Sequence, residues 1–340
     1  MGKEITIYDI ARELSLSATS VSRALRKDTN ISKATTKKIA EKAAEMGYRY
    51  NNFAGNLGKQ KTHTIGIIVH RLNSNFIASV LAGIEKITID AGYDIIITQS
   101  CESYEKEVAN ARNLFHKRVD GIIASLSFSS KDLDHFNPFF ERNIPVIFFD
   151  RVDEESEMTQ VIIDNYKTGY IATKHLLDQG CHRIVLLTSS LNRNVYSQRH
   201  RGYTDALFDS GIAYNKDRVL VKDISEESAI AAAHEILSMD PMPDGLFVTN
   251  DFVAAVCMQE LKAYGVKIPH DIAIVGFNND TICKIVEPQL TTINYPGKEM
   301  GEITARNLIS QMKGLENVTK PNRIIVRSEL IIRDSSVKKK

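Results

Sequence analysis

Charged and amide side chains stand directly after several short apolar runs in this sequence of 340 residues. Asp150 and Arg151 follow IPVIFF, Asn250 and Asp251 end FVTND, and Asn278 follows IVGF. A planar arginine beside a carboxylate can bracket the vicinal hydroxyls of a sugar. Such chemistry requires the ends of these runs to meet in space.

The apolar runs are rich in isoleucine and valine, and from Thr64 onward they alternate with helical stretches. The first are TIGIIV, DIIITQ, VDGIIASL and PVIFFD; after EESEMTQVIIDN the pattern restarts with RIVLLTS, VLVKDI, DGLFVTN and IAIVGF. This alternation predicts an α/β protein with two doubly wound parallel sheets in tandem. Such sheets bind ligands beyond the carboxyl ends of their strands, so two facing lobes would enclose a cleft.

The overall composition is ordinary, with 43% hydrophobic residues, 25% charged residues and a net charge of +1. No apolar run approaches the roughly 18 residues of a membrane span, and MGKEITIYD lacks the apolar core of a secretory signal. The four cysteines are far apart and have no nearby histidine ligands. We therefore expect a cytoplasmic protein with no metal, cofactor or membrane partner.

The charge is distributed unevenly along the chain. Residues 1–60 carry eleven Lys and Arg against six Asp and Glu, whereas the remainder carries 32 against 36. A basic head on a mildly acidic body suggests a polyanion partner for the head.

Three short helices are predicted in this head. Thr6 with Asp9, Ser17 and Ser32 can cap their starts, and Gly47 can end the third. Helices this short are marginal alone and must share one core, and a tight pair braced by a third helix is the helix-turn-helix arrangement. Its second helix presents small and polar residues that can enter the major groove of DNA. Periodicity alone fits a plain three-helix bundle equally well.

The head contains the segments TIYDIARELSLSATSVSRAL and TTKKIAEKAAEMGYRYNNFAGNLG. Together they resemble the DNA-binding domain of the lactose repressor and galactose repressor (LacI/GalR) family of transcription regulators. The resemblance continues along the body, in the family's order, through DGIIA, IPVIFFDR, IIDNYKTGYIATKHLLDQG, RGY, FVTND, DIAIVGFNND and PQLTTINYP.

This resemblance implies an all-α helix-turn-helix head at residues 1–50 and a hinge helix or linker at 51–61. Residues 62–340 would form the ligand-binding and dimerisation domain, which is periplasmic-binding-protein-like. Its N-lobe would hold about 62–160 with 293–323, and its C-lobe about 161–292 with 324–340.

By the same resemblance, Arg23 reads base edges together with Ala18 and Thr19, because arginine can grip O6 and N7 of guanine. Ser17 and Ser22 match positions that contact phosphates. The DNA-binding positions implied are Thr6, Tyr8, Ser17, Ala18, Thr19, Ser22, Arg23, Asn30, Asn51, Ala54 and Leu57.

The hinge departs from the family pattern. Leu57 matches a leucine that wedges into the minor groove, but Tyr50 replaces the usual proline, and Gly55 and Gly58 weaken the helix. We expect the free hinge to be disordered and to become ordered on the operator. A flexible linker with a stray leucine is the alternative.

The resemblance also implies a sugar-like effector in the cleft. Its contacts would be His70, Asn75, Phe76, Asp150, Arg151, Arg193, Arg199, Asn250, Asp251, Asn278 and Tyr295.

The charge of this effector can be argued from the same residues. Asn278 stands where much of the family has an aspartate, and Arg151, Arg193 and Arg199 would face Asp150 and Asp251 with a formal charge of +1. We therefore expect a sugar acid or sugar phosphate. A neutral sugar fits equally well if Arg193 points into solvent and Asn278 hydrogen-bonds a hydroxyl.

Together these features predict a one-component transcription regulator that binds a near-palindromic operator. The C-terminal RDSSVKKK has no heptad leucines, which favours a homodimer over a tetramer. The regulator could be a repressor or an activator, and its effector could be an inducer or a co-repressor. An enzyme is the rival class, but no GxGxxG or GxxxxGK[ST] motif follows a strand, there is no GxSxG motif, and no catalytic residue is assigned. A secreted sugar-binding protein would need a signal peptide and no DNA-binding head.

Overall fold

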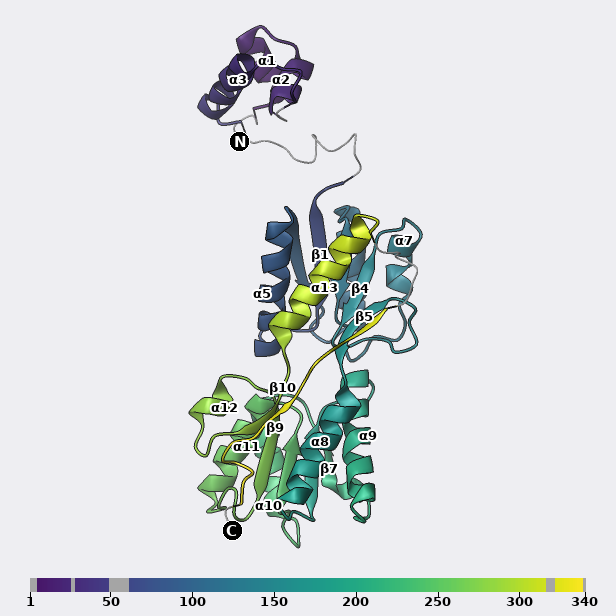
Figure 1. The fold of residues 1–340 in the computed structure, drawn as a ribbon, viewed down its shortest axis with the longest axis vertical. Coiled ribbons are helices and arrows are strands. Elements are labelled where there is room, and N and C mark those ends of the chain that lie inside the picture. Colours follow the sequence, from purple (N-terminus) through teal and green to yellow (C-terminus); the bar gives the residue numbers. More distant parts are fainter. Residues whose placement is uncertain (1–4, 26–27, 49–60, 316–321, 339–340) are drawn as a thin grey trace. The chain divides into compact units, whose positions relative to one another are not determined.

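The computed structural model describes residues 5–25, 28–48, 61–315 and 322–338. The chain forms two units, Met1–Thr62 and His63–Lys340, which are described separately as the head and the body (Figure 1). The hinge positions Asn51, Ala54 and Leu57 lie outside the described residues.

The head contains α1 (Ile7–Leu14), α2 (Ala18–Leu25) and α3 (Lys33–Glu45). Its core is formed by buried Ile10, Ala11, Val21, Ala24, Ile39 and Ala43, so each helix contributes one apolar stripe. The expected shared core is therefore confirmed.

Local hydrogen bonds define the helix starts as the sequence indicates. The Asp9 carboxylate accepts hydrogen bonds from the Thr6 amide at 2.9 Å and the Thr6 hydroxyl at 2.7 Å. Ser17 Oγ and Ser32 Oγ each accept the amide three residues later, both at 3.1 Å. Gly47 has φ +68°, the left-handed conformation expected after α3.

The described body contains two six-stranded sheets. The first has the order β11-β5-β4-β3-β1-β2 and is parallel throughout. The second has the order β12-β10-β9-β8-β6-β7 and is parallel except for β12, which runs antiparallel to β10. The strands are β1 (Thr64–Val69), β2 (Asp94–Gln99), β3 (Gly121–Ala124), β4 (Val146–Phe149), β5 (Thr159–Ile163), β6 (Ile184–Thr188), β7 (Val219–Val221), β8 (Gly245–Val248), β9 (Ala273–Asn278), β10 (Thr291–Asn294), β11 (Arg323–Val326) and β12 (Leu330–Ile331).

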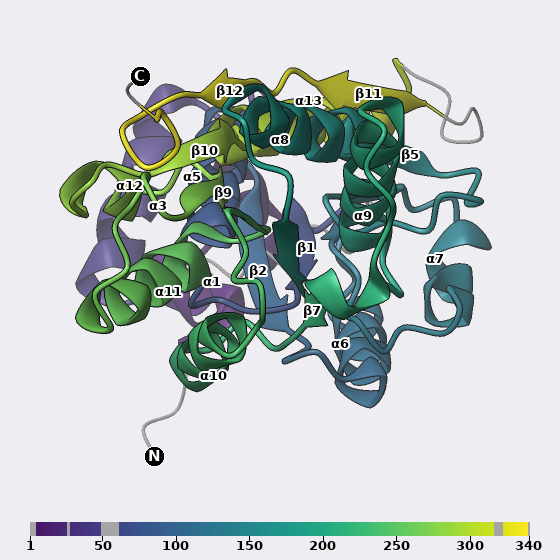
Figure 2. The same cartoon turned by 90° about the horizontal axis from the view of Figure 1, so that it is seen from below.

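Helices cover both faces of each sheet, as Figure 2 shows for the second sheet. They are α5 (Asn75–Asp90), α6 (Tyr104–His116), η1 (Asp134–Phe136), α7 (Asn137–Phe140), α8 (Asn165–Asp178), α9 (Asn194–Asp209), η2 (Lys216–Arg218), α10 (Glu226–Leu237), α11 (Asp251–Ala263), α12 (Ile282–Ile285) and α13 (Gly297–Met312). Along β6, Ile184 and Leu186 share a core with residues of α8 and α9, whereas Val185 and Leu187 pack with α10 and α11. Both faces of the strand are therefore buried, which explains its unbroken apolar run.

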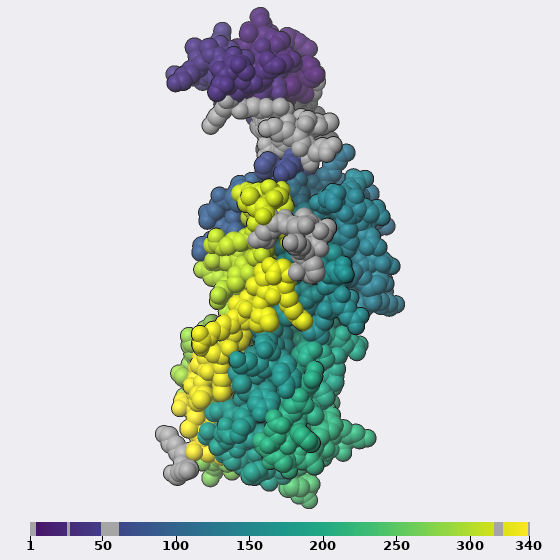
Figure 3. All heavy atoms as spheres, turned by 45° about the vertical axis from the view of Figure 1, so that its right-hand side comes forward, coloured from purple at the N-terminus to yellow at the C-terminus, as the bar shows by residue number. Residues whose placement is uncertain are grey.

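The chain passes between the two lobes after β5, after β10 and after β11. Figure 3 shows the last passage, where the C-terminal residues run along one side of the body. Since β11 pairs with β5, residues 323–326 belong to the N-lobe, and the expected boundary at about 323 lies instead after Val326. Likewise Ile163 still belongs to the first sheet, where it pairs with Val326, and Asn294 belongs to the second. No described helix has the length and apolar character needed to span a bilayer.

Candidate functional site

A cavity of about 390 Å³ lies between the lobes, at the carboxyl ends of the strands of both sheets. The N-lobe and the C-lobe both contribute to its walls, and Tyr295 comes from the passage between β10 and α13. The expected positions that line it are His70, Asn75, Phe76, Asp150, Arg151, Arg199, Asn250, Asn278 and Tyr295.

Arg199 is fixed by the close packing of α8 against α9. A Cβ on Gly169 of α8 would lie 2.3 Å from the Arg199 carbonyl oxygen, so only glycine permits this approach. The guanidinium donates to Asn165 Oδ1 at 2.9 Å and to the Thr249 carbonyl at 3.4 Å, and it stacks 3.5 Å from the Phe277 ring centroid. Arg199 therefore enters the cavity already oriented.

Asp150 stands at the end of β4 in a left-handed conformation with φ +59°. Its carboxylate accepts hydrogen bonds from the Tyr295 hydroxyl at 2.6 Å and the Ser125 hydroxyl at 3.4 Å. Burial raises the pKa of Asp150, and nearby Arg151 opposes that shift. Such a backbone conformation in an aspartate is typical of functional sites.

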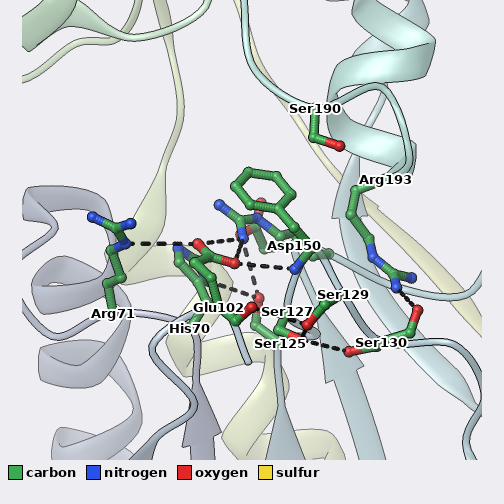
Figure 4. Close-up of polar contacts among 12 residues, drawn as sticks. His70, Arg71, Glu102, Ser125, Ser127, Ser129, Ser130, Asp150, Ser190 and Arg193 are labelled. Carbon is green, nitrogen blue, oxygen red and sulfur yellow. Dashed lines mark hydrogen bonds and ion pairs between the residues drawn. The ribbon is translucent and has the colours of Figure 1, made fainter. Parts of the chain in front are cut away.

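Arg151 points the other way from Asp150, toward the carboxylate of Glu102. Arg151 Nη1 donates to both Glu102 oxygens at 2.9 Å, and its guanidinium lies 3.9 Å from the Phe128 ring centroid. Figure 4 shows Arg71 directed toward Glu102. The Arg71 Nε–Glu102 Oε1 distance is 3.8 Å, so one carboxylate serves two arginines.

His70 follows β1 and is almost fully buried in the cavity wall. Burial, reinforced by Arg151 and Arg71, lowers its pKa well below the usual value, so the imidazole is neutral at pH 7. Its Nδ1 lies 3.4 Å from Ser125 Oγ. His70 can thus offer a neutral hydrogen-bonding group to a ligand.

In the head, Thr19 and Arg23 of α2 are exposed, and Ala18 and Ser22 are half-buried. Ala18 packs partly against the head core, so only part of its surface is available. Tyr8 is 69% exposed. The Thr6 hydroxyl is already bound to Asp9, and the Asn30 amide group donates to Asp28 at 2.9 Å.

Comparison with known proteins gives matches to both units. Residues 6–51 match the model of bacterial regulatory proteins of the lacI family, and residues 173–336 match the periplasmic binding protein-like domain. Catabolite control protein A of Priestia megaterium is 30% identical, over 91% of this chain and 92% of the relative. The chain belongs to the LacI family of bacterial regulatory proteins.

Two further similarities agree with this family. The HTH-type transcriptional repressor PurR of Vibrio campbellii is 31% identical, over 92% of this chain and 93% of the relative. Among solved structures, the transcriptional regulator CelR in its cellobiose complex is 26% identical, with a TM-score of 0.71 over 98% of this chain and 100% of that chain. The chain is therefore a DNA-binding transcription regulator of the LacI family.

In this LacI-family regulator, two of the expected effector positions lie elsewhere. Asp251 does not line the cavity; it is completely buried beneath it, where it accepts hydrogen bonds from Thr292 Oγ1 at 2.7 Å and the Asp280 amide at 2.9 Å. Arg193 does not line the cavity either, because its guanidinium donates to the carbonyl oxygen of Ser130 in the opposite lobe (Figure 4).

The cavity also contains residues that the sequence interpretation missed. They are the carboxylates Glu102, Asp223 and Asp280, the exposed Arg71, and the aromatic residues Phe128, Tyr196 and Phe252. Among the described lining residues, three arginines face four carboxylates, which gives a formal charge of −1. The expected charge of +1 was wrong, and with it the argument for an anionic ligand.

Proposed function

We propose that this LacI-family regulator binds a near-palindromic operator as a homodimer, and that a small sugar-like effector in the cavity controls its operator affinity. The observation that carries the proposal is the cavity lined by both lobes. A ligand that touches both lobes binds one lobe arrangement better than another, which is the condition for changing a distant equilibrium.

The chemistry of the cavity suits a polyhydroxylated ligand. Arg199 and Asp150 provide an oriented donor and an oriented acceptor, and Asn250 and Asn278 can supply both kinds of hydrogen bond. Aromatic rings such as Phe252 can pack against the apolar face of a sugar ring. The volume of about 390 Å³ is within the range for small-molecule sites, and the similar regulator CelR has been solved with cellobiose.

For the head, the proposal assigns base reading to exposed Arg23 and Thr19, with Ala18 in a minor apolar role. Ser17 and Ser22 would contact phosphates. The Ser17 hydroxyl oxygen accepts the Ser20 amide, which leaves the hydroxyl proton available for a hydrogen bond to a phosphate oxygen.

Homodimer formation is supported by large apolar side chains that the body leaves exposed. Ile89 of α5 is 65% exposed and Ile97 of β2 is 39% exposed. Burying such side chains against a second copy would be favourable. An Ile89→Glu variant should sediment as a monomer and bind the operator more weakly, whereas an unchanged sedimentation coefficient would exclude this surface.

The effector site is tested through Asp150→Asn. Asparagine tolerates the left-handed conformation of this position and removes only the charge. Duplexes that the protein selects from a random pool would serve as operators. The affinity for these duplexes would be measured without a sugar and with each sugar of a panel. We expect the parent to change affinity by about tenfold or more with one sugar class, which corresponds to a coupling of about 1.4 kcal/mol.

Asp150→Asn should retain operator binding and lose the response to the sugar. Asp153→Asn, in the same loop but outside the cavity lining, is the matched control and should respond like the parent. Equal responses from both variants would show that the effector does not bind here.

A further inference from the structure

The C-lobe wall of the cavity carries negative charge without a compensating cation. Asp223 and Asp280 line this wall, and Asp251 is completely buried beside Asp280. Within the described residues, neither Asp223, Asp251 nor Asp280 forms an ion pair.

The arginines of the cavity are engaged with other partners. Arg151 gives both of its short contacts to Glu102, and Arg71 approaches the same carboxylate. Arg199 donates to Asn165 and to the Thr249 carbonyl, and the charged carboxylate that acts on it is Asp150. The positive charge of the cavity is therefore concentrated around Glu102 and Asp150.

Asp280 is a half-buried lining carboxylate that lies beside a second acidic residue. Its amide donates to Asp251 Oδ2 at 2.9 Å, which brings two acidic residues together, and Asn278 Nδ2 reaches its carboxylate only at 3.5 Å. Burial and the charge of Asp251 raise the pKa of Asp280 to about 6, against the opposing effect of Asn278 and Asn75.

Among the described groups, no cation lowers the pKa of Asp280. Lys298 of α13 borders an adjoining open cavity that Asp280 also lines, but its charge acts on Glu302. Beneath the wall, a Cβ on Gly276 would lie 2.3 Å from Asp251 Oδ1, so the floor is packed too closely for Asp251 to withdraw. Lobe closure over a neutral ligand would leave this negative charge buried and uncompensated, which is costly.

We propose that the effector carries a protonated amine, as an amino sugar or another polyhydroxylated amine does, and that Asp280 binds the ammonium group. The inference rests on the proposed effector role of the cavity and names the ligand class for it. An ammonium donates charge-assisted hydrogen bonds to the carboxylate and compensates the buried charge of Asp251 as well.

The test compares hexoses with their 2-amino, N-acetylamino and uronic acid forms by calorimetry at about pH 7. The N-acetylamino form keeps the nitrogen and removes its charge, so it separates charge from shape. We expect the amine to bind about tenfold or more tightly than its neutral parent, as a charge-assisted hydrogen bond implies, and the uronic acid to bind most weakly.

Asp280→Asn should abolish the preference, so that the amine and the neutral hexose bind with similar affinity. Asp217→Asn, which removes an exposed carboxylate outside the cavity, is the charge-matched control and should keep the preference for the amine. If the neutral hexose binds as tightly as the amine or more tightly, the amine assignment is overturned, and the effector role of the cavity is left intact. Absence of binding by every member of the panel would count against both.

Discussion

At the scale of single residues, Asp280 lies where its charged form is disfavoured. Its pKa of about 6 exceeds the ordinary aspartate value, so the folded protein holds this proton more tightly than the unfolded chain does. The free energy of unfolding therefore falls as the pH rises from about 4 to about 6, and the loss is complete at pH 7.

Asp280→Asn should consequently stabilise the ligand-free protein at pH 7. We expect a gain of about 1–2 kcal/mol, because each pKa unit corresponds to about 1.4 kcal/mol and the group is partly exposed. Urea unfolding at about pH 7 and pH 4 would measure it, and the gain should vanish at the lower pH. A variant that is less stable than the parent at pH 7 would contradict the assignment of an unfavourable charge here.

Arg23 is exposed on α2. Its substitution can distinguish a contact with a base from a contact with a phosphate. If it grips a guanine, Arg23→Ala should cost about 1–3 kcal/mol and relax the preference at one base in each half-site. Binding to a library of operator variants would measure both effects. Equal weakening on every duplex would instead indicate a phosphate contact.

The residues of the cavity show which features of a site are visible in a sequence. Asp150, Asn250 and Asn278 could be predicted because they follow apolar runs, and the carboxyl ends of parallel strands meet at one edge. Glu102 and Asp223 follow β2 and β7 in the same way and could have been found by the same rule. The burial of Asp251 depends on its packing against Gly276 and Thr292, which no local pattern reveals.

At the scale of elements, the contact between α8 and α9 sets the position of Arg199. Gly169 and Gly202 let the two backbones touch, since a Cβ on Gly202 would lie 2.2 Å from the Tyr166 carbonyl oxygen. The helices themselves were predictable from their apolar spacing, but their separation was not.

Gly169→Ala should push α9 and Arg199 away from the cavity. We expect a loss of about 1–3 kcal/mol in unfolding free energy from overpacking, together with weaker effector binding. Lys167→Ala, on the exposed side of the same helix, is the control and should change neither quantity appreciably. Normal effector affinity in a destabilised Gly169→Ala protein would show that Arg199 is positioned by other contacts.

At the same scale, the strands next to the passages between the lobes were not predicted from the sequence. β5, β10, β11 and β12 each have two to five residues and were not recognised as strands. Their role depends on partners that are distant in sequence, as in the pairing of Arg323 with Gln160. The main strands of both sheets were predictable because each is an apolar run that alternates with helical stretches.

At the scale of the whole body, Arg193 connects the lobes. It lies at the start of α9, and its contact with the Ser130 carbonyl reaches across to the N-lobe. Next to it, Asn194 accepts the Val152 amide at 3.0 Å and donates to the Asp150 carbonyl at 3.1 Å. Because the Arg193 contact joins residues of both lobes, it can form only while the lobes are close.

Arg193→Ala should therefore favour more open lobes. Spin labels on Lys106→Cys and Glu226→Cys, in a Cys101→Ser background, would report the separation between the lobes. We expect a longer or broader distance distribution than in the parent, and Asn192→Ala is the neighbouring control. Identical distributions in both variants would show that the Arg193 contact does not hold the lobes together.

The strand β1 spans the N-lobe from the point where the chain enters it, at Thr64, to the cavity, where His70 follows its last residue. Six residues at about 3.3 Å each make this a stiff rod of about 20 Å. The passages between the lobes lie at the cavity end, so a rotation of the N-lobe about them would make β1 a lever arm. A rotation of about 10° would carry the entry point through an arc of about 3.5 Å, on the scale of the rise per residue in a strand. Under the proposed function, a small change at the ligand would become a displacement of the entry point at Thr64.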